Sequence, residues 1–378
     1  MANKCTKIIA EIGRVLIGCT FVFSGFVKAV DPLGSAYKFH DYFATWGINW
    51  LEWTTLPASF GLSALEFALG VCLLFGVYRK LVSWLILLFM AFMTLLTLYL
   101  AIYNPVTDCG CFGDALVITN WQTFYKNVVL IAFSIIVFIY NQQLTRLCAK
   151  KWQKWICAFS CIFILGFSFY CYTFLPVLDF RPYKIGNNIL ELSAIPDDAE
   201  SDVYETTLVY EKNGVKQKFS LNDYPKGDPE WKFVETTNTL IKKGYEPPIH
   251  YFIITTEDGE EITDVVLADT SYTFLLIAHK LTQAKDSHCE RINWIFDYAA
   301  ENNYRFLCLT ASTSNEIEEW KSNTGAEYPF CITDGTTLKT IIRSNPGLVL
   351  LKDAKVIGKW PHTRLPKRSD LTKLMDKQ

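Results

Sequence analysis

Residues 81–103 read LVSWLILLFMAFMTLLTLYLAIY, and this stretch contains no charged residue. Because a helix of about 20 apolar residues spans the hydrocarbon core of a bilayer, the stretch predicts a transmembrane helix. Four similar stretches occur at residues 8–29, 57–77, 122–141 and 155–177. The first lacks an Ala-x-Ala-like cleavage site, so we interpret it as an uncleaved helix and not as a signal peptide. We therefore predict an α-helical membrane bundle of about five transmembrane helices.

The charge of the chain changes sign at Phe180. Residues 1–179 hold 12 Lys and Arg and 8 Asp and Glu, whereas residues 180–378 hold 24 and 30, so the net charges are +4 and −6. We expect a transmembrane domain over 1–179 and a soluble domain over 180–378 that buries a core of its own. The soluble half is acidic and shows no basic face, so nucleic acid is not an expected partner. The 12 cysteines are too dispersed for a disulfide-dense secreted scaffold.

Basic residues cluster before the first predicted helix and in the loops after the second and the fourth. They are Lys4, Lys7, Arg79, Lys80, Arg146, Lys150, Lys151 and Lys154. Since Lys and Arg are retained in the cytoplasm, the pattern predicts a cytoplasmic N-terminus, with residues 30–56, the loop 104–120 and the tail on the opposite side. Residues 35–53 mix aromatic and polar residues, which is typical of a helix at the membrane surface, either an anchor or a lid.

Arg14, Lys28 and Glu66 are charged residues that lie inside predicted helices. A charge at the bilayer centre costs about 3 kcal/mol or more, so we expect Glu66 to be paired, protonated or turned toward a polar cavity. In antiparallel helices that rise about 1.5 Å per residue, Glu66 falls between Arg14 and Lys28 in depth. The sequence leaves open whether Glu66 forms a structural ion pair or handles protons.

The loop between the third and fourth predicted helices contains Cys109-Gly110-Cys111-Phe112-Gly113-Asp114. A Cys-x-Cys disulfide closes a very small ring, and Gly110 relieves the backbone restriction that this closure imposes. Such a strained bridge is more easily reduced than a relaxed one, which favours thiol–disulfide chemistry. A purely structural disulfide and a metal site are the alternatives, and a metal site would need further ligands.

Over roughly residues 8–145, three motifs resemble those of the DoxX/MauE group of redox-associated membrane proteins. They are Arg14-x3-Gly18-x5-Ser24-Gly25-x2-Lys28, Leu65-Glu66-x3-Gly70-x5-Gly76 and Cys109-Gly110-Cys111-Phe112-Gly113. The methylamine-utilisation member of the group is associated with disulfide formation in a periplasmic protein. The architecture, with a periplasmic domain added after the membrane domain, resembles that of the Bacteroidetes branch of this group. The resemblance implies a bacterial inner-membrane protein that takes part in disulfide chemistry.

The tail alternates strands and helices, which predicts an α/β domain with a mixed sheet. A hairpin is expected over 204–211 and 215–221 around Asn213-Gly214. Further strands are predicted at 251–256, 272–279, 305–310, 329–332, 347–352 and 355–360. Helices are predicted at 288–301, 315–323 and 336–342 and from Ser369 onward.

Over about residues 250–378 this order resembles the thioredoxin fold. Asn345-Pro346 resembles the segment that places a cis-proline before a strand in thioredoxins. The region that should carry Cys-x-x-Cys reads Lys285-Asp286-Ser287-His288-Cys289, so the domain lacks a dithiol of its own. His288 could lower the pKa of Cys289, Cys308 is expected in a core strand, and Cys331 could be partly exposed. A structural role is expected for all three cysteines. These features predict a thioredoxin-like domain that binds partners.

The leading hypothesis is a membrane component of a periplasmic thiol–disulfide relay. In it, Cys109 and Cys111 exchange oxidation with an envelope protein that has exchangeable thiols, and Glu66 assists. Membrane lipid is the other expected partner. No bound cofactor is expected, although a quinone acceptor is implied by analogy with other disulfide-generating membrane proteins. The alternatives are a non-enzymatic assembly or scaffold protein whose degenerate thioredoxin-like domain binds partners, and a small-molecule transporter that uses Glu66.

Overall fold

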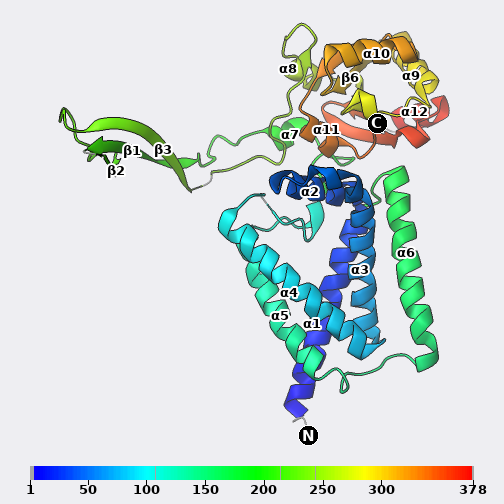
Figure 1. The fold of residues 1–378 in the computed structure, drawn as a ribbon. Helices are drawn as coiled ribbons and strands as arrows, with labels where there is room; N and C mark the ends of the chain where they lie inside the picture. Colours follow the sequence, from blue (N-terminus) through cyan, green and yellow to red (C-terminus); the bar gives the residue numbers. More distant parts are fainter. Residues whose placement is uncertain (1–3, 107, 213, 243, 377–378) are drawn as a thin grey trace.

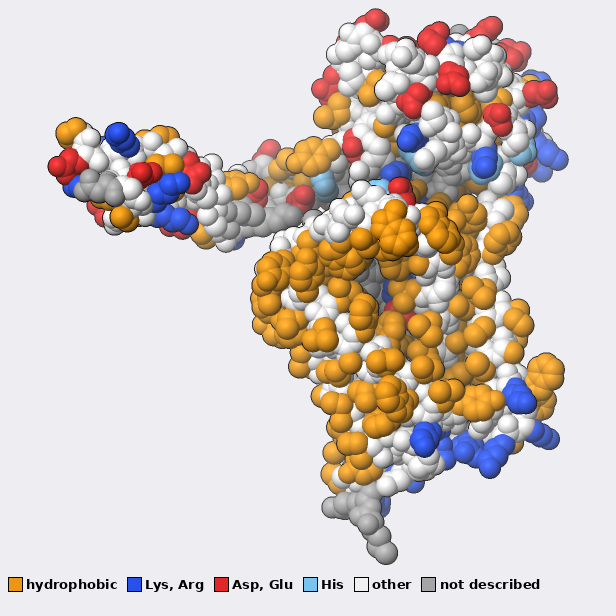
Figure 2. Space-filling view, in the orientation of Figure 1, with side chains coloured by type: hydrophobic (Ala, Val, Ile, Leu, Met, Phe, Trp, Pro, Cys, Tyr) orange, Lys and Arg blue, Asp and Glu red, His pale blue; other side chains and the backbone are white. Residues whose placement is uncertain are grey.

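The computed structural model describes residues 4–106, 108–212, 214–242 and 244–376. Five long apolar helices confirm the five predicted membrane spans, and the chain is a membrane protein (Figure 1). They are α1 Lys4–Val30, α3 Thr55–Phe75, α4 Arg79–Tyr103, α5 Asn120–Ile139 and α6 Gln153–Phe174. Apolar side chains cover the outside of this bundle as a broad band, which is the surface that lipid chains require (Figure 2).

The two ends of the bundle differ in charge. The predicted basic clusters lie at one end, where blue side chains gather in Figure 2, and we call this end the basic side. The loop of the two cysteines and the tail domain lie at the other end, which we call the tail side (Figure 1). The predicted surface helix over 35–53 is two elements, α2 Pro32–Thr45 and the 3-10 helix η1 Asn49–Thr54. They separate at Gly47, which adopts a left-handed φ of 68°.

Glycines allow α1 and α3 to pack closely. A Cβ atom at Gly25 would lie 2.5 Å from the backbone nitrogen of Phe67. A Cβ atom at Gly70 would lie 2.7 Å from the backbone nitrogen of Val22. Small residues at such positions let membrane helices approach through their backbones. This contact brings Lys28 of α1 next to Glu66 of α3.

The tail contains two separate sheets. The first has the order β2-β1-β3 and projects sideways from the molecule (Figure 1). Its strands are β1 Val203–Lys212, β2 Val215–Ser220 and β3 Lys232–Lys242. The hairpin of β1 and β2 confirms the prediction, although Asn213 of its predicted turn lies outside the described residues. Strand β3 was not predicted, because its run of Thr, Asn and Glu has no strong apolar alternation.

The second sheet has six strands in the order β4-β7-β6-β5-β8-β9. Strands β5 Tyr272–Ala278, β6 Arg305–Thr310 and β7 Phe330–Ile332 are parallel, and β8 Gly347–Lys352 runs antiparallel to β5. The edge strands are β4 Thr255–Thr256 and β9 Lys355–Pro361. The helices are α9 Cys289–Glu301, α10 Ser314–Thr324, α11 Gly335–Ile341 and α12 Arg368–Met375, with the short α7 Ile189–Ser193 and α8 Thr263–Leu267. This is the predicted α/β domain with the strand order of a thioredoxin-like core.

Two apolar clusters bury the two faces of the six-stranded sheet. Phe274 and Leu276 of β5 point to one face, and Leu275 and Ile277 point to the other. This alternation follows from the two-residue period of a strand that is covered on both sides. The prediction of a long strand over 251–256 was wrong, since only Thr255–Thr256 pair, and with β7. The Asn345–Pro346 peptide bond is cis, as the sequence predicted.

Candidate functional site

The two cysteines lie in the loop between α4 and α5, at the tail side of the bundle. We call residues 108–114 the redox loop. Its turn forms locally, because the Asp108 carboxylate accepts a hydrogen bond from the Gly110 N–H at 2.8 Å. Gly110 has a φ of 67°, which a residue with a Cβ adopts only at a cost. Neighbouring helices fix the outside of the turn: Lys38 Nζ lies 2.7 Å from Asp108, and the Tyr42 hydroxyl donates to the Cys109 carbonyl at 3.1 Å.

Cys109 is the partly exposed member of the pair, and its surroundings favour the thiolate. The thiol and the N–H of Cys111 bond to its sulfur and lower the pKa of Cys109 to about 6, although burial opposes this shift. The Cys111 nitrogen lies 3.3 Å from Sγ of Cys109. Thr123, in the first turn of α5, has its Oγ1 3.8 Å from the same sulfur. The N-terminal end of a helix stabilises negative charge, so α5 acts in the same direction.

Cys111 is buried, and its surroundings favour the protonated thiol. The hydrogen bond with Cys109 and burial raise the pKa of Cys111 above its ordinary value. Both cysteines are free thiols in this structure. The loop therefore presents one ionisable, accessible thiol and one protonated, buried thiol.

A buried polar cluster holds the backbone of Cys111. The Lys28 ammonium donates to the Cys111 carbonyl at 2.7 Å, to Ser24 Oγ at 2.7 Å and to Glu66 Oε2 at 2.8 Å. The Ser24 hydroxyl also donates to the Cys111 carbonyl at 2.7 Å. All three protons of the ammonium group are thus engaged. Glu66 is paired, one of the outcomes expected from its depth, and it acts on the redox loop through Lys28.

Arg14 lies far from this cluster. Its Nε is 2.6 Å from Glu11, and its guanidinium donates to the Leu74 carbonyl near the basic end of α3. Arg14 therefore braces helix ends and does not pair with Glu66. At the redox loop, the Phe112 ring packs against Phe23 with ring centroids 5.4 Å apart. Gly113 begins a short 3-10 turn with a φ of 50°.

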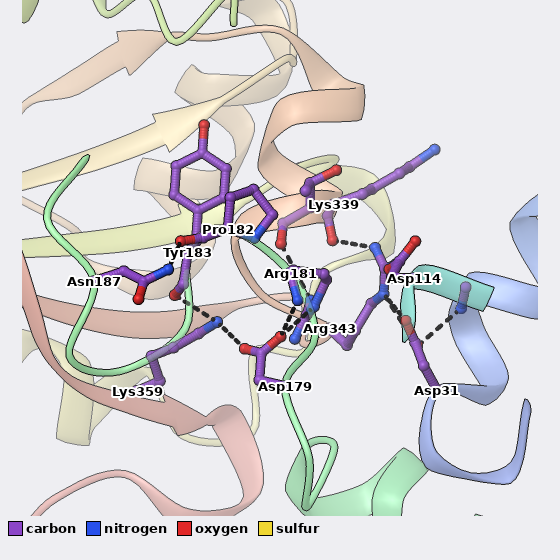
Figure 3. Close-up of polar contacts among 12 residues, drawn as sticks. Asp31, Asp114, Asp179, Arg181, Pro182, Tyr183, Asn187, Lys339, Arg343 and Lys359 are labelled. Carbon is purple, nitrogen blue, oxygen red and sulfur yellow. Dashed lines mark hydrogen bonds and ion pairs between the residues drawn. The ribbon is translucent and has the colours of Figure 1, made fainter. Parts of the chain in front are cut away.

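Asp114 closes the redox loop against the tail domain, through a cluster that Figure 3 shows. Arg343, which follows α11, places Nε 2.9 Å from Asp31 and Nη2 3.4 Å from Asp114. Burial alone would raise the pKa of Asp31, but the charges of Arg343 and Arg181 hold it below its ordinary value. Burial raises the pKa of Asp114, and Arg343 offsets only part of this effect. We call Asp31, Asp114 and Arg343 the interdomain clamp.

A second ion cluster fixes the start of the tail. Asp179 accepts from Arg181 at 2.7 Å and from Lys359 at 2.7 Å (Figure 3). Arg181 also donates to the Thr340 carbonyl at 3.2 Å. The chain that leaves α6 is therefore tied to the six-stranded sheet and to α11 directly after it emerges from the bundle.

The tail cysteines are buried. Cys331 is not partly exposed, because it belongs to the apolar cluster that includes Leu338 and Ile341 of α11, and only 2% of the residue is accessible. Cys308 is fully buried in β6, as predicted. Burial and the nearby Asp286 raise the pKa of Cys289 to about 11, so His288 does not activate it. The His288 ring instead contacts the Ser287 hydroxyl at 3.1 Å.

Several residues around the redox loop were not predicted from the sequence. Lys126 lies over the Phe112 ring at 4.2 Å from its centroid and contributes positive charge near Cys109. A lysine inside an apolar span is the same signal that singled out Lys28, so Lys126 could have been found. Lys38, Tyr42 and Thr123 carry no such signal, because Lys and Tyr are common in helices at a membrane surface and Thr is common in the first turn of a helix. Among the described residues, no group of three or more His, Cys, Asp or Glu side chains has a geometry that could hold a metal ion.

Comparisons with known proteins bear on two parts of the chain. Residues 6–140 match the sequence family described as methylamine utilisation protein MauE. Residues 204–243, which cover most of the projecting sheet, match a domain of unknown function, DUF8463. No curated protein matches the chain.

One solved structure is similar to part of the tail. It is the solution structure of a proposed protein disulfide isomerase from Bacteroides thetaiotaomicron, with 14% identity and a TM-score of 0.27. The match covers 33% of this chain and 82% of that chain. At this TM-score the likeness supports neither a fold nor a function.

Proposed function

We propose that this membrane protein exchanges disulfides with a partner protein through Cys109 and Cys111. One observation carries the proposal: within one loop, the accessible thiol has a lowered pKa and its neighbour is buried with a raised pKa. A purely structural bridge needs no such asymmetry, whereas exchange requires one accessible sulfur that also leaves readily as a thiolate. We place the redox loop and tail in the periplasm of a bacterial inner membrane, because all basic clusters lie at the other end of the bundle.

The proposed direction of electron flow follows from the Cys109 thiolate. Hydrogen bonds and charge that stabilise this thiolate stabilise the reduced form of the pair, which makes its disulfide more oxidising. A partner thiolate attacks Cys109 Sγ of the disulfide, and Cys111 leaves and takes up a proton. The second partner thiolate then attacks the mixed disulfide, and Cys109 leaves as a thiolate. The partner gains a disulfide and loses two electrons, which the Cys109–Cys111 pair accepts.

Lys28 and Glu66 are positioning residues in this scheme. The Lys28 ammonium holds the Cys111 carbonyl, and the Glu66 carboxylate balances the charge of Lys28 within the bundle. Arg14, Phe112, Gly113 and Asp114 shape or brace the surrounding structure.

Re-oxidation of the pair needs a two-electron acceptor, and a quinone is the proposed class. The apolar groove between α3 and α6 has Phe67, Val71 and Phe75 on one wall and Trp152 and Trp155 on the other. Most of this lining lies toward the basic side, away from the redox loop. The groove therefore does not fit a quinone that takes electrons directly from Cys109.

Trapping tests the proposal. In the Cys111→Ala variant, the Cys109 thiolate attacks the disulfide of the oxidised partner, which is the reverse of the last step above, and one partner thiolate is released. Because no Cys111 thiol remains to displace the partner, Cys109 should accumulate in the mixed disulfide. The trapped species should appear on a non-reducing gel of native membranes and vanish after reduction. The Cys109→Ser/Cys111→Ala double variant is the matched control and should trap nothing. If Cys111→Ala yields no adduct and the thiol status of the envelope is unchanged, the cysteines only brace the bundle, and a scaffold role replaces the relay.

A further inference from the structure

A cleft of about 760 Å³ separates the tail-side end of the bundle from the tail domain. Tyr37 and His40 of α2 line it from the bundle, and Lys285 and Ser344 line it from the tail. Its size is that of a site for a ligand of several residues or a large head group. The cleft is therefore a candidate binding site outside the redox loop.

A smaller cavity continues from the cleft to the redox loop. This cavity measures about 260 Å³, and Asp108 and Gly110 of the redox loop border it. It shares Tyr37 and Lys339 with the cleft, together with His40 and Arg343. A ligand that extends from the cleft into this cavity would thus lie beside the chain segment that carries Cys109.

Lysines give the cleft a net positive charge, because three of them line it together with only two carboxylates, Glu52 and Glu316. Lys280, Lys285 and Lys339 line it, and none of them forms an ion pair with a carboxylate among the described residues. Lys280 and Lys285 are exposed, and Lys339 lies over the Tyr37 ring at 4.8 Å. In contrast, acidic side chains are numerous in Figure 2 on the part of the tail domain that lies away from the bundle.

The acidic residues of the cleft already have partners. Glu52 Oε1 lies 3.3 Å from His40 Nε2. Glu316 accepts the Thr313 N–H at 2.8 Å and caps α10. Burial lowers the pKa of His279 to about 4 and also lowers that of His362, so these rings are neutral at pH 7. Glu52 and Glu316 keep their negative charges, but the three lysines outnumber them, so the cleft is net positive.

We infer that this cleft binds an acidic, extended segment of the reduced partner protein, with Lys280, Lys285 and Lys339 facing its carboxylates. The inference rests on the proposed exchange function and names the chemistry of its substrate. Charge complementarity of this kind speeds encounter and selects among partners. It would bring the partner's cysteine to the redox loop without any dithiol in the tail domain. An anionic lipid head group is the rival occupant, because the cleft lies where the bundle ends.

The test measures binding without exchange. The full-length protein is placed in phosphatidylcholine nanodiscs, and fluorescein-labelled peptides rich in Asp and Glu, with Ser in place of Cys, are titrated by anisotropy. The acidic peptide should bind, and a Lys-rich counterpart should not. Lys280→Glu/Lys285→Glu should weaken binding at least tenfold, because each reversal removes an attraction and adds a repulsion. Lys216→Glu/Lys218→Glu, on the exposed strand β2, is the matched control and should leave the Kd unchanged.

Two results would overturn the inference. One is equal affinity for the acidic and Lys-rich peptides, or an unchanged Kd in Lys280→Glu/Lys285→Glu. The other is a pair of observations: peptide binding is lost in phosphatidylglycerol nanodiscs, and phosphatidylglycerol associates more weakly with the Lys280→Glu/Lys285→Glu variant than with the wild type. Together they would assign the cleft to lipid. Cys109→Ser should still bind the serine peptide. Binding without trapping therefore refutes the exchange function alone, and trapping without binding refutes the cleft alone.

Discussion

The pH dependence of Cys109 alkylation is a sharp test of the redox loop. With a pKa of about 6, Cys109 is about 90% thiolate at pH 7, whereas an ordinary thiol of pKa about 8.5 is about 3% thiolate. This is about a 30-fold gain in reactive species. Intrinsic nucleophilicity falls with pKa, however, by about tenfold or more over this range. The net rate at pH 7 should therefore exceed that of an ordinary thiol only two- to threefold or so.

The midpoint of the pH profile is consequently the better readout. The reduced protein in nanodiscs is treated with iodoacetamide across pH 4.5 to about 9.5, covering the range from below the shifted to above the ordinary thiol pKa, and mass spectrometry of peptides quantifies each cysteine. Cys109 should show a midpoint near pH 6. The thiolate is present above that pH and lost below it, so partner exchange should also slow as pH falls through the midpoint.

Removing the neighbouring thiol should move this midpoint. Cys111→Ala deletes the largest contribution to the lowered pKa of Cys109 but keeps the backbone N–H and Thr123. The midpoint should rise toward the ordinary value, and the thiolate fraction at pH 7 should fall by up to about 30-fold. Cys331→Ala, in the buried core of the tail, is the control and should leave the profile of Cys109 in place. A wild-type midpoint near pH 8.5, or one that Cys111→Ala does not move, would refute the argument.

Two further predictions concern the groups that hold the redox loop. Glu66→Gln leaves the buried Lys28 ammonium without a counter-charge and should destabilise the bundle by about 3–5 kcal/mol in thermal unfolding. The Lys28→Met/Glu66→Met variant should regain most of that stability and still shift the Cys109 midpoint. If its midpoint returned to the wild-type value together with its stability, the positioning role would be contradicted. Arg343→Gln should loosen the tail and speed limited proteolysis after α6, whereas Arg305→Gln, at a partly exposed pair, should not. Equal cleavage rates would show that the interdomain clamp does not hold the tail.

The sequence predicted the elements that are governed by local pattern. Five apolar stretches are each long enough to cross a bilayer, and the alternation of strands and helices after residue 272 has strong apolar periodicity, so both parts are as predicted. The projecting sheet was only half predicted, since the apolar residues of β3 lie at its two ends without alternation and the strand obtains its order from pairing with β1. The short pairing of Thr255–Thr256 depends on β7, a partner distant in sequence.

Contacts between distant segments could not be predicted in the same way. Depth along the helices limited the partners of Glu66 to Arg14 and Lys28, but only helix rotation decides between them. Nothing in the sequence links Arg343 to Asp31, because the pair joins two domains whose relative placement no local pattern records. The burial of Cys331 likewise follows from an apolar cluster that joins distant segments, among them β5, β6 and α11.

The last turn of α1 carries two attachments three residues apart. Lys28 reaches the carbonyl of Cys111, and Asp31, just beyond the helix, reaches Arg343. An inserted residue between them would turn one anchor by about 100° about the axis relative to the other. Only one of the two could then be kept. The spacing of these side chains thus fixes the orientation of the redox loop and of the tail domain relative to each other about the axis of α1.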